Sequence, residues 1–314
     1  MIASMVMESV PAPLTTALAR LESRWGSAAV RLGSANLSGS ARTAGPYGPV
    51  APGPRGSAAP EPASGGFVDG ALALAASPQP APELAPSLSD DIVPTGFARL
   101  DELLGTGGLP RGVSASFRGA RSSGKTALAL HCLAQAQARG GIVAFLDLCR
   151  IFDPLEAQAR GVDLRWLLVL RPADADEGWA LAAALVSGRQ IDLLVIDLPQ
   201  RLCGSHEAAL RRLAAHARRS TVRMIVLEPM GLAAPVHGAL AESVAVRLEL
   251  EQRSWLRAGR DIVGRCVAVN IAKNRFGPPG RETEIEIHYL ADGDHGAALD
   301  RHSARERPAI RRVA

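Results

Sequence analysis

The sequence predicts an α/β fold with a mainly parallel central sheet, helices on both faces and a C-terminal antiparallel β extension. Short apolar runs alternate with helical patterns between residues 113 and 227. This alternation is typical of parallel strands buried on both faces. After about residue 240, the chain contains only strand patterns in which polar and apolar residues alternate, as in sheets with one wet face. A glycine-rich turn follows the first apolar run.

Composition sets the limits within which this fold must be built. Of the 314 residues, 47% are hydrophobic and 4% aromatic, so a large core must consist mostly of aliphatic side chains. The net charge of +4 permits contact with nucleic acid without demanding it. The four cysteines form no CxxC pair, which predicts reduced thiols and a cytoplasmic location. No apolar run reaches the roughly 18 residues of a membrane span, so no membrane contact is expected.

The chain is predicted to have four regions. Residues 1–33 form an N-terminal segment with a helix that ends near Gly26 and Gly33. Residues 34–90 are dominated by Ala, Gly, Pro and Ser and are expected to be a disordered linker. Residues 91–295 form the folded core, and residues 296–314 form a loose basic tail. The apolar face of the first helix consists of Leu14, Leu18, Leu21 and Trp25.

Each element of the core follows from its local pattern. Strands are predicted where apolar or alternating runs occur, and helices where apolar residues recur with a period of about 3.6. The predicted strands are 113–117, 142–148, 167–170, 193–196, 223–227, 244–250, 266–272 and 283–289. The predicted helices are 125–138, 153–160, 176–187 and 206–219.

The glycine-rich turn has the pattern of a phosphate-binding loop. It reads Gly119, Ala120, Arg121, Ser122, Ser123, Gly124, Lys125, Thr126 and fits G-x-x-x-x-G-K-[ST]. Its backbone N–H groups can surround phosphate oxygens, Lys125 can reach the β- and γ-phosphates, and Thr126 can ligate Mg²⁺. Lys125 and Lys273 are the only lysines among 35 basic residues, which indicates that a compact ammonium group is needed here. The alternative is an ordinary Gly/Ser turn.

Asp197 is the second candidate ligand of Mg²⁺. It directly follows the apolar strand 193–196, two βα units after the glycine-rich turn. A carboxylate at the end of such a strand can hold the water shell of Mg²⁺ opposite the phosphate loop. The alternative is an aspartate that caps a helix, since many strands end in one.

These motifs, taken with others in the same order, resemble the RecA recombinase family. The further matches are VPTGFARLD at 93–101, GGLPRG at 107–112, AFLD at 144–147, Asp153-Pro154, GVD at 161–163, Val263-Gly264 and Lys273-Asn-Arg275. The resemblance covers about 14–33 and 91–290, and it implies a RecA-like P-loop fold that binds ATP and Mg²⁺, with Asp153 at the nucleotide. It also implies that the N-terminal helix packs onto a neighbouring subunit. The linker and the family's separate C-terminal domain have no counterpart.

Three positions depart from the family pattern. The glutamate that activates water in the family is Cys149 here, and a thiol is a poor base for water. Asp147 lies on the same strand face and is a possible substitute base with shorter reach. The adenine-stacking aromatic falls at Glu156, and the pair that senses the γ-phosphate is replaced by Glu228-Pro229. We therefore predict slow hydrolysis or none, and altered base selectivity.

The second lysine lies in the C-terminal hairpin. The resemblance implies that Lys273 and Arg275 reach across a subunit interface to the neighbour's phosphates, which would make the protein a homo-oligomer. The alternative is a solvated basic turn.

Contact with DNA is predicted to be weak. The family's two DNA-binding loops are shortened here to about 199–205 and 230–238, with few basic residues, so strand exchange is not expected. The helix that follows the first loop can neutralise phosphates without reading sequence. Its alternative is a solvated, Arg-rich face. The basic residues concerned are Arg201 and His206 near the first loop, His237 in the second, and Arg211, Arg212, Arg218, Arg219 and Arg223.

Three functions remain open. The first is a RecA-like accessory protein similar to the ImuA-type proteins of bacterial translesion-synthesis cassettes, in which ATP is a structural or switching ligand. Its partners would be DNA-repair proteins, namely translesion polymerase components or RecA itself. The second is an active DNA-dependent ATPase in recombinational repair, with Asp147 or Glu228 as base. The third is a scaffold or inhibitor that retains only the fold.

Overall fold

The computed structural model describes residues 12–33, 91–200, 202, 206–289 and 310–313. Its helices are α2 Ala12–Trp25, α4 Ala98–Leu104, α5 Lys125–Gln137, α6 Pro154–Ala159, α7 Ala175–Gly188, α8 His206–Ser220 and α9 Ala234–Ser243, with a 3₁₀ turn at Leu164–Trp166. Its strands are β1 Val30–Leu32, β2 Ile92–Val93, β3 Leu109–Pro110, β4 Ser114–Gly119, β5 Val143–Asp147, β6 Leu167–Leu170, β7 Leu193–Asp197, β8 Arg223–Pro229, β9 Val246–Ala258, β10 Asp261–Asn274, β11 Glu282–His288 and β12 Ile310–Val313.

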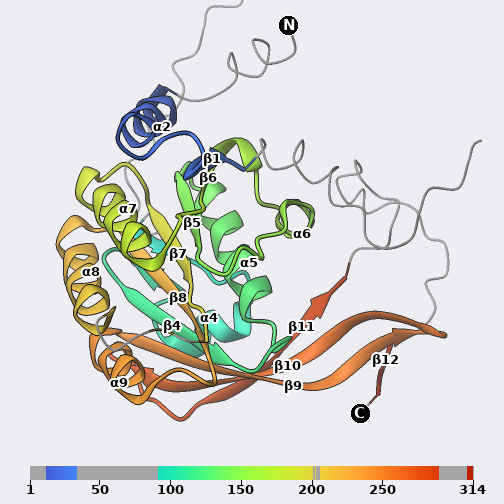
Figure 1. The fold of residues 1–314 in the computed structure, drawn as a ribbon. Coiled ribbons are helices and arrows are strands. Elements are labelled where there is room, and N and C mark those ends of the chain that lie inside the picture. The colour runs from blue at the N-terminus through green and yellow to red at the C-terminus, as the bar shows by residue number, and fades with distance from the viewer. Residues whose placement is uncertain (1–11, 34–90, 201, 203–205, 290–309, 314) are drawn as a thin grey trace, which may run out of the picture.

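One large mixed sheet organises the described residues, and it confirms the predicted fold class (Figure 1). The strand order is β1-β6-β5-β7-β8-β4-β9-β10-β11, and β12 pairs with β9. The strands from β6 to β9 in this order run parallel. β9, β10 and β11 then form the predicted antiparallel extension. β2 and β3 form a separate small hairpin.

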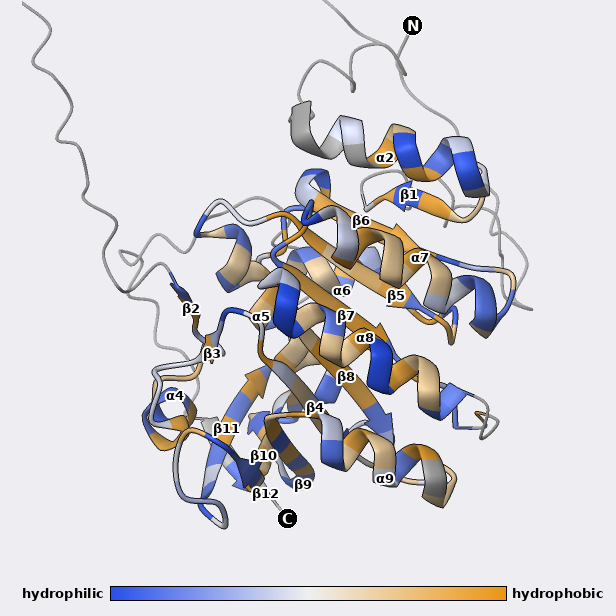
Figure 2. Ribbon diagram, turned by 90° about the vertical axis from the view of Figure 1, so that its left-hand side faces the viewer, coloured by the Kyte–Doolittle hydropathy of each residue, from blue (hydrophilic) through white to orange (hydrophobic). Residues whose placement is uncertain are grey.

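The centre of the sheet is buried on both faces. All five residues of β5 and of β7 are buried. Successive side chains alternate between two hydrophobic clusters: Phe145 packs in the cluster that contains α5, and Leu146 in the one that contains α7 and α8. Figure 2 shows the corresponding hydrophobic band along the central strands. This two-sided burial explains why these strands read as apolar runs.

The two ends of the chain differ from expectation. The N-terminal helix ends at Trp25, because Gly26 adopts φ +80°, and residues 30–32 form a strand instead of a helix end. Val30 is fully buried and pairs antiparallel with Leu170 at the sheet edge. Residues 310–313 pair with β9, so the prediction of a loose tail is wrong there. The predicted linker 34–90 and residues 296–309 lie outside the described residues.

The segment after β8 also differs. Residues 234–243 form α9, where the sequence had predicted only strands after about residue 240 and a loop before it. β9 and β10 extend well past their predicted ends. Among the described residues, no helix is long and apolar enough to cross a membrane.

Candidate functional site

The glycine-rich turn joins the end of β4 to the start of α5. A Cβ atom on Gly119 would lie 2.4 Å from the Ser123 Oγ and 2.5 Å from the carbonyl oxygen of Leu250, so only glycine fits there. Gly124 is the N-cap residue of α5 and adopts φ +92°, a conformation that L side chains rarely take. The turn is therefore tight, and the N-terminus of α5 faces its interior, where a helix favours an anion.

Lys125 folds back over this turn. Its Nζ donates hydrogen bonds to the carbonyl oxygens of Gly119 and Ala120, both at 2.8 Å. Burial lowers the pKa of Lys125, and the Asp197 carboxylate partly opposes that shift. Ser123 is buried, and its Oγ has no hydrogen-bond partner among the described residues. The turn thus holds a cation and a free hydroxyl, as a phosphate site requires.

Asp197 ends β7 directly beside Asp147, its register partner at the end of β5. It is 7% exposed, and its Oδ2 is buried without a hydrogen-bond partner among the described residues. Burial raises the pKa of Asp197 from 3.8 to about 6, and the Asp147 carboxylate adds to this, whereas Cys149 and Lys125 act against it. An unpaired carboxylate oxygen next to the glycine-rich turn fits a hydrated Mg²⁺.

Asp197 makes the unliganded protein sensitive to pH. Because its pKa is raised to about 6, the folded state binds this proton more tightly than the unfolded state. Stability therefore falls as the pH rises from about 4 to above 6. Asp197→Asn should remove this loss and stabilise the metal-free protein near neutral pH, by on the order of 3 kcal/mol. Thermal unfolding near pH 4 and near pH 7 measures the difference.

The control for this experiment is Asp261→Asn, since the Asp261 side chain is exposed at the start of β10. That variant should keep the pH dependence of the parent. If the Asp197→Asn protein loses as much stability between the two pH values as the parent does, the pKa of Asp197 is not raised.

Cys149 lies next to Asp197, and its Sγ is 3.9 Å from the Asp197 carbonyl oxygen. Burial and, secondarily, the Asp197 carboxylate raise the pKa of the Cys149 thiol to about 12. The group is thus a neutral thiol at physiological pH. A neutral thiol cannot take a proton from an attacking water.

Asp147, the candidate substitute base, is fully buried. Its carboxylate accepts hydrogen bonds from the backbone N–H groups of Ile151 at 2.9 Å and Phe152 at 3.2 Å. It also pairs with Arg171, whose Nε lies 3.0 Å away. Both carboxylate oxygens therefore hold the turn after β5 in place, which does not favour a catalytic role.

The end of β8 contains a buried cluster of charges. The Glu228 side chain is fully buried and lies 3.0 Å from Arg247, 2.6 Å from His237 Nδ1 and 3.5 Å from Arg118. Arg118 also pairs with Glu249 at 3.2 Å. Glu228 Oε1 is thus contacted by Arg118 of β4, His237 of α9 and Arg247 of β9, whereas Oε2 is buried without a hydrogen-bond partner among the described residues. Because the side chain is 0% exposed, neither oxygen meets solvent, which does not favour a role as base for water. Sequence reasoning identified Glu228 but not its partners, although Arg118 directly precedes Gly119.

Asp153 and Glu156 both make contacts that stabilise α6 and its surroundings. Asp153 is the N-cap residue and accepts hydrogen bonds from the backbone N–H groups of Leu155 and Glu156. Glu156 pairs with Arg160 at 2.7 Å. Arg160 in turn donates to the carbonyl oxygen of His288 on β11 at 2.6 Å. The carboxylate at position 156 therefore ties α6 to the C-terminal sheet through Arg160.

Lys273 and Arg275 both contact the C-terminal end of α9. Lys273 Nζ donates to the carbonyl oxygens of Ala241 at 2.6 Å and Glu242 at 3.2 Å. Arg275 donates to the Glu242 carbonyl oxygen at 3.1 Å. Cations are favourable at a helix C-terminus, so within one chain these residues stabilise α9.

The arginines in α8 are exposed, whereas the arginine that follows the helix is buried. Arg211, Arg212, Arg218 and Arg219 are all exposed. Arg211 pairs with Glu207 and Glu242. Arg223 is wrong as a phosphate-binding candidate, because it is 2% exposed and its guanidinium donates to the carbonyl oxygens of Leu109 and Asp91.

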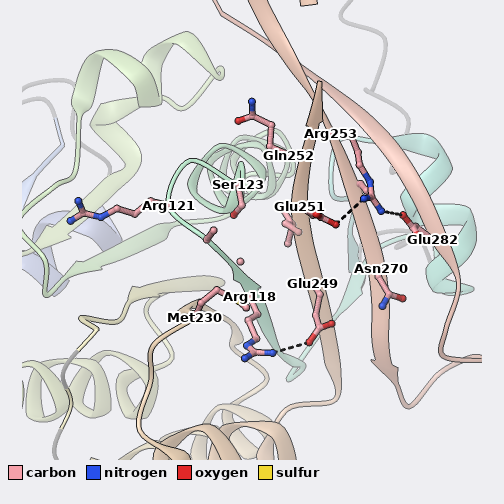
Figure 3. Close-up of a pocket in the computed structure, with 14 residues that line it drawn as sticks. Arg118, Arg121, Ser123, Met230, Glu249, Glu251, Gln252, Arg253, Asn270 and Glu282 are labelled. Atoms are coloured by element: carbon pink, nitrogen blue, oxygen red, sulfur yellow. Dashed lines mark hydrogen bonds and ion pairs between the residues drawn. The ribbon is translucent and has the colours of Figure 1, made fainter. Parts of the chain in front are cut away.

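A cleft with a volume of 530 Å³ opens beside the phosphate loop (Figure 3). Its walls are the glycine-rich turn, Met230 and residues of β9, β10 and β11. The charged residues among its lining are Arg118, Arg121, Glu249, Glu251, Arg253 and Glu282. Dashed lines in Figure 3 mark the pairs of Arg118 with Glu249 and of Arg253 with Glu251 and Glu282.

Known proteins share this sequence pattern. The RecA N-terminal domain matches residues 85–210. RecA of Symbiobacterium thermophilum is 34% identical over 230 residues, which cover 64% of this chain and 66% of that protein. RecA of Leifsonia xyli is 34% identical over 239 residues, 67% of each chain. RecA of Thermus thermophilus is 34% identical over 233 residues, 65% of this chain and 68% of that protein. The chain spans about two thirds of the length of such relatives. On this similarity and this fold, the chain belongs to the RecA family.

Proposed function

We propose that this chain is a divergent RecA-like protein that binds ATP with Mg²⁺ and acts as an accessory factor in the bacterial DNA-damage response. In this proposal it hydrolyses ATP slowly or not at all. The observation that carries the proposal is an intact phosphate loop beside a neutral thiol at the position of the expected base.

The nucleotide-binding half of the proposal rests on the loop and Asp197. The backbone of Gly119–Thr126 would surround the phosphates, and Lys125 would exchange its two carbonyl contacts for phosphate oxygens. The Thr126 hydroxyl and the unpaired Oδ2 of Asp197 would hold Mg²⁺ and its water shell. When bound, the metal would neutralise charge on the phosphates. Family membership supports the same ligands.

The proposal of slow or absent ATP hydrolysis rests on the lack of a free base to activate water. Cys149 is a neutral thiol, Asp147 is held by Arg171 and two N–H groups, and the fully buried Glu228 pairs with Arg247. ATP would then act as a structural or switching ligand that changes which surface the protein presents to its partners. We infer that the partners are DNA-repair proteins, namely translesion polymerase components or RecA. Self-association and weak DNA contact through α8 belong to the same proposal.

ATP turnover with and without single-stranded DNA tests this function. We expect slow turnover that DNA does not stimulate, together with retention of a polymerase-like partner in a pull-down. Robust DNA-stimulated turnover would reject the accessory role in favour of an active DNA-dependent ATPase.

Placing a carboxylate at position 149 should restore ATP hydrolysis. A positioned general base contributes about 10²–10⁴-fold to a rate. Because Cys149 lies beside Asp197 at the end of β5, we expect Cys149→Glu to raise ATP turnover at least about tenfold. A steady-state phosphate-release assay measures the change.

The matched control is Cys149→Ser, which alters the same side chain without adding a carboxylate and should leave turnover unchanged. An unchanged rate in Cys149→Glu, with nucleotide binding intact, would place the defect elsewhere, for example at Glu156 or Glu228.

A further inference from the structure

Arg265 joins the C-terminal strands to the phosphate loop. It lies on β10, where β9 and β10 form a ribbon that extends beyond the parallel strands (Figure 1). Its Nη1 donates a hydrogen bond to the carbonyl oxygen of Ser122, in the middle of the loop. A Cβ atom on Gly124 would lie 2.7 Å from Ile287 Cδ1 of β11, so the strands also pack against the end of the loop. The loop is therefore supported from outside as well as by α5.

The rings of Trp255 and Tyr289 flank the Arg265 side chain. Trp255 is the register partner of Arg265 on β9, so the two side chains lie on the same face of the sheet. The guanidinium carbon lies 6.0 Å from the centroid of the Trp255 ring and 5.1 Å from that of Tyr289. Aromatic faces at such distances attract a cation. The guanidinium is thus held in the position from which it reaches Ser122.

The contact fixes the peptide group that joins Ser122 to Ser123. Because a trans peptide is planar, its C=O and N–H groups point to opposite sides. The carbonyl oxygen of Ser122 is bound to Arg265, and on the opposite side the Ser123 N–H donates across the loop to the Ala120 carbonyl oxygen at 3.3 Å. Ser122 itself adopts φ +59°, a left-handed conformation that residues other than glycine rarely take. Left-handed residues of this kind direct successive N–H groups toward an anion.

We infer that Arg265 is a positioning residue for the phosphate loop. It holds the Ser122 carbonyl oxygen away from the bound phosphates and thereby keeps the Ser123 N–H directed at them. Without the guanidinium, this peptide group can rotate and turn its carbonyl oxygen, which repels phosphate, toward the ligand. The inference rests on the proposed binding of ATP and extends the site to a residue far outside the Gly119–Thr126 motif.

Two measurements on an Arg265→Ala variant of the full chain test the inference. The first is the affinity for ATP with Mg²⁺, measured by titration calorimetry. The second is amide hydrogen exchange of residues 119–126 without nucleotide, measured by mass spectrometry, which reports local opening of the loop. Urea unfolding checks the stability of the variant. Arg265→Met, which keeps an unbranched stem between the rings but has no donor, takes its place if the alanine variant is less stable than the parent.

The matched control is Arg260→Ala, which removes the same charge from an exposed position in the turn between β9 and β10. We expect Arg265→Ala to weaken ATP binding about tenfold, the effect of losing one hydrogen bond to a charged group. Exchange of the loop amides should become about tenfold faster, while exchange of β5 stays unchanged. Arg260→Ala should match the parent in both measurements.

Two results would overturn the inference. One is loop exchange in Arg265→Ala that equals that of the parent, and any loss of ATP affinity would then mean that Arg265 contacts the nucleotide directly. The other is faster loop exchange with ATP affinity unchanged or raised, which would make Arg265 irrelevant to binding or a restraint on it. Failure of the parent protein to bind ATP would instead reject the proposed function, and the exchange measurement would still decide whether Arg265 orders the loop.

Discussion

Replacing Lys125 by alanine is expected to weaken ATP binding by about two orders of magnitude. A hydrogen bond to a charged group contributes about 1.5–3 kcal/mol, and the Lys125 ammonium would make such bonds to the phosphates. Among the described residues, this ammonium group donates hydrogen bonds to the Gly119 and Ala120 carbonyl oxygens of its own loop. Its loss should therefore affect binding far more than folding. Titration calorimetry with ATP and Mg²⁺ measures the affinity.

Lys273→Ala is the natural control, since Lys273 is the other lysine and its Nζ contacts the end of α9 instead of the loop. It should bind ATP like the parent if each chain binds ATP alone, and more weakly if Lys273 reaches the phosphates of a neighbouring copy. Equal affinity of the parent and the Lys125→Ala protein would reject a functional phosphate loop. The fold would then serve as a scaffold without nucleotide.

Replacing Glu228 by glutamine is expected to destabilise the protein by about 3 kcal/mol. Removing one partner of a buried ion pair leaves the other charge uncompensated, which typically costs about 3–5 kcal/mol. The Glu228 side chain is fully buried, and that of Arg247, 3.0 Å away, is only 7% exposed. The residual contact of Arg247 with Glu249 at 3.9 Å offsets little of this loss. Urea unfolding measures the difference.

Two further variants separate the pair from simple loss of packing. Glu249→Gln removes a carboxylate that is 40% exposed, and it should cost less than about 1 kcal/mol. Combining Glu228→Gln with Arg247→Met removes both buried charges and should recover much of the lost stability. A double variant as unstable as the sum of its single changes would show that the two charges do not interact.

The parallel centre of the fold was predictable because burial on both faces leaves a plain pattern. The runs 143–147, 167–170 and 193–197 are apolar except for the aspartates that end two of them. In the flanking helices, apolar residues recur with the helical period of about 3.6 residues. The glycine-rich turn and its following helix were predictable for a related reason: close approach at Gly119 and a left-handed conformation at Gly124 both require glycine.

The missed elements are short or depend on distant partners. Residues 30–32 form a strand only because Leu170 and its neighbours offer an unpaired sheet edge. The Arg-rich segment 310–313 becomes a strand through pairing with β9, and Arg312 there pairs with Glu286 at 2.9 Å. No local sequence pattern predicts either strand pairing. α9 contains Pro235 and Gly238, which weaken a helical pattern.

Sequence reasoning selected Cys149 and Asp197 as candidates because the residue type at each position defines the proposed chemistry. Sequence reasoning missed the contacts in which residues converge from separate elements. The cluster around Glu228 draws Arg247 from β9 and His237 from α9. Arg223 shows the opposite error, because an arginine that follows a basic helix is buried here at the start of β8.

The short strand β1 has a consequence for how the protein is produced. It covers the outer edge of β6, whose four residues Leu167–Leu170 are all buried and apolar. A chain shortened to begin at residue 91 would leave this edge with unpaired N–H and C=O groups and no charged residue to block association. Uncovered apolar edges of this kind template aggregation, so such a chain should precipitate or form mixed oligomers where the longer one stays in solution.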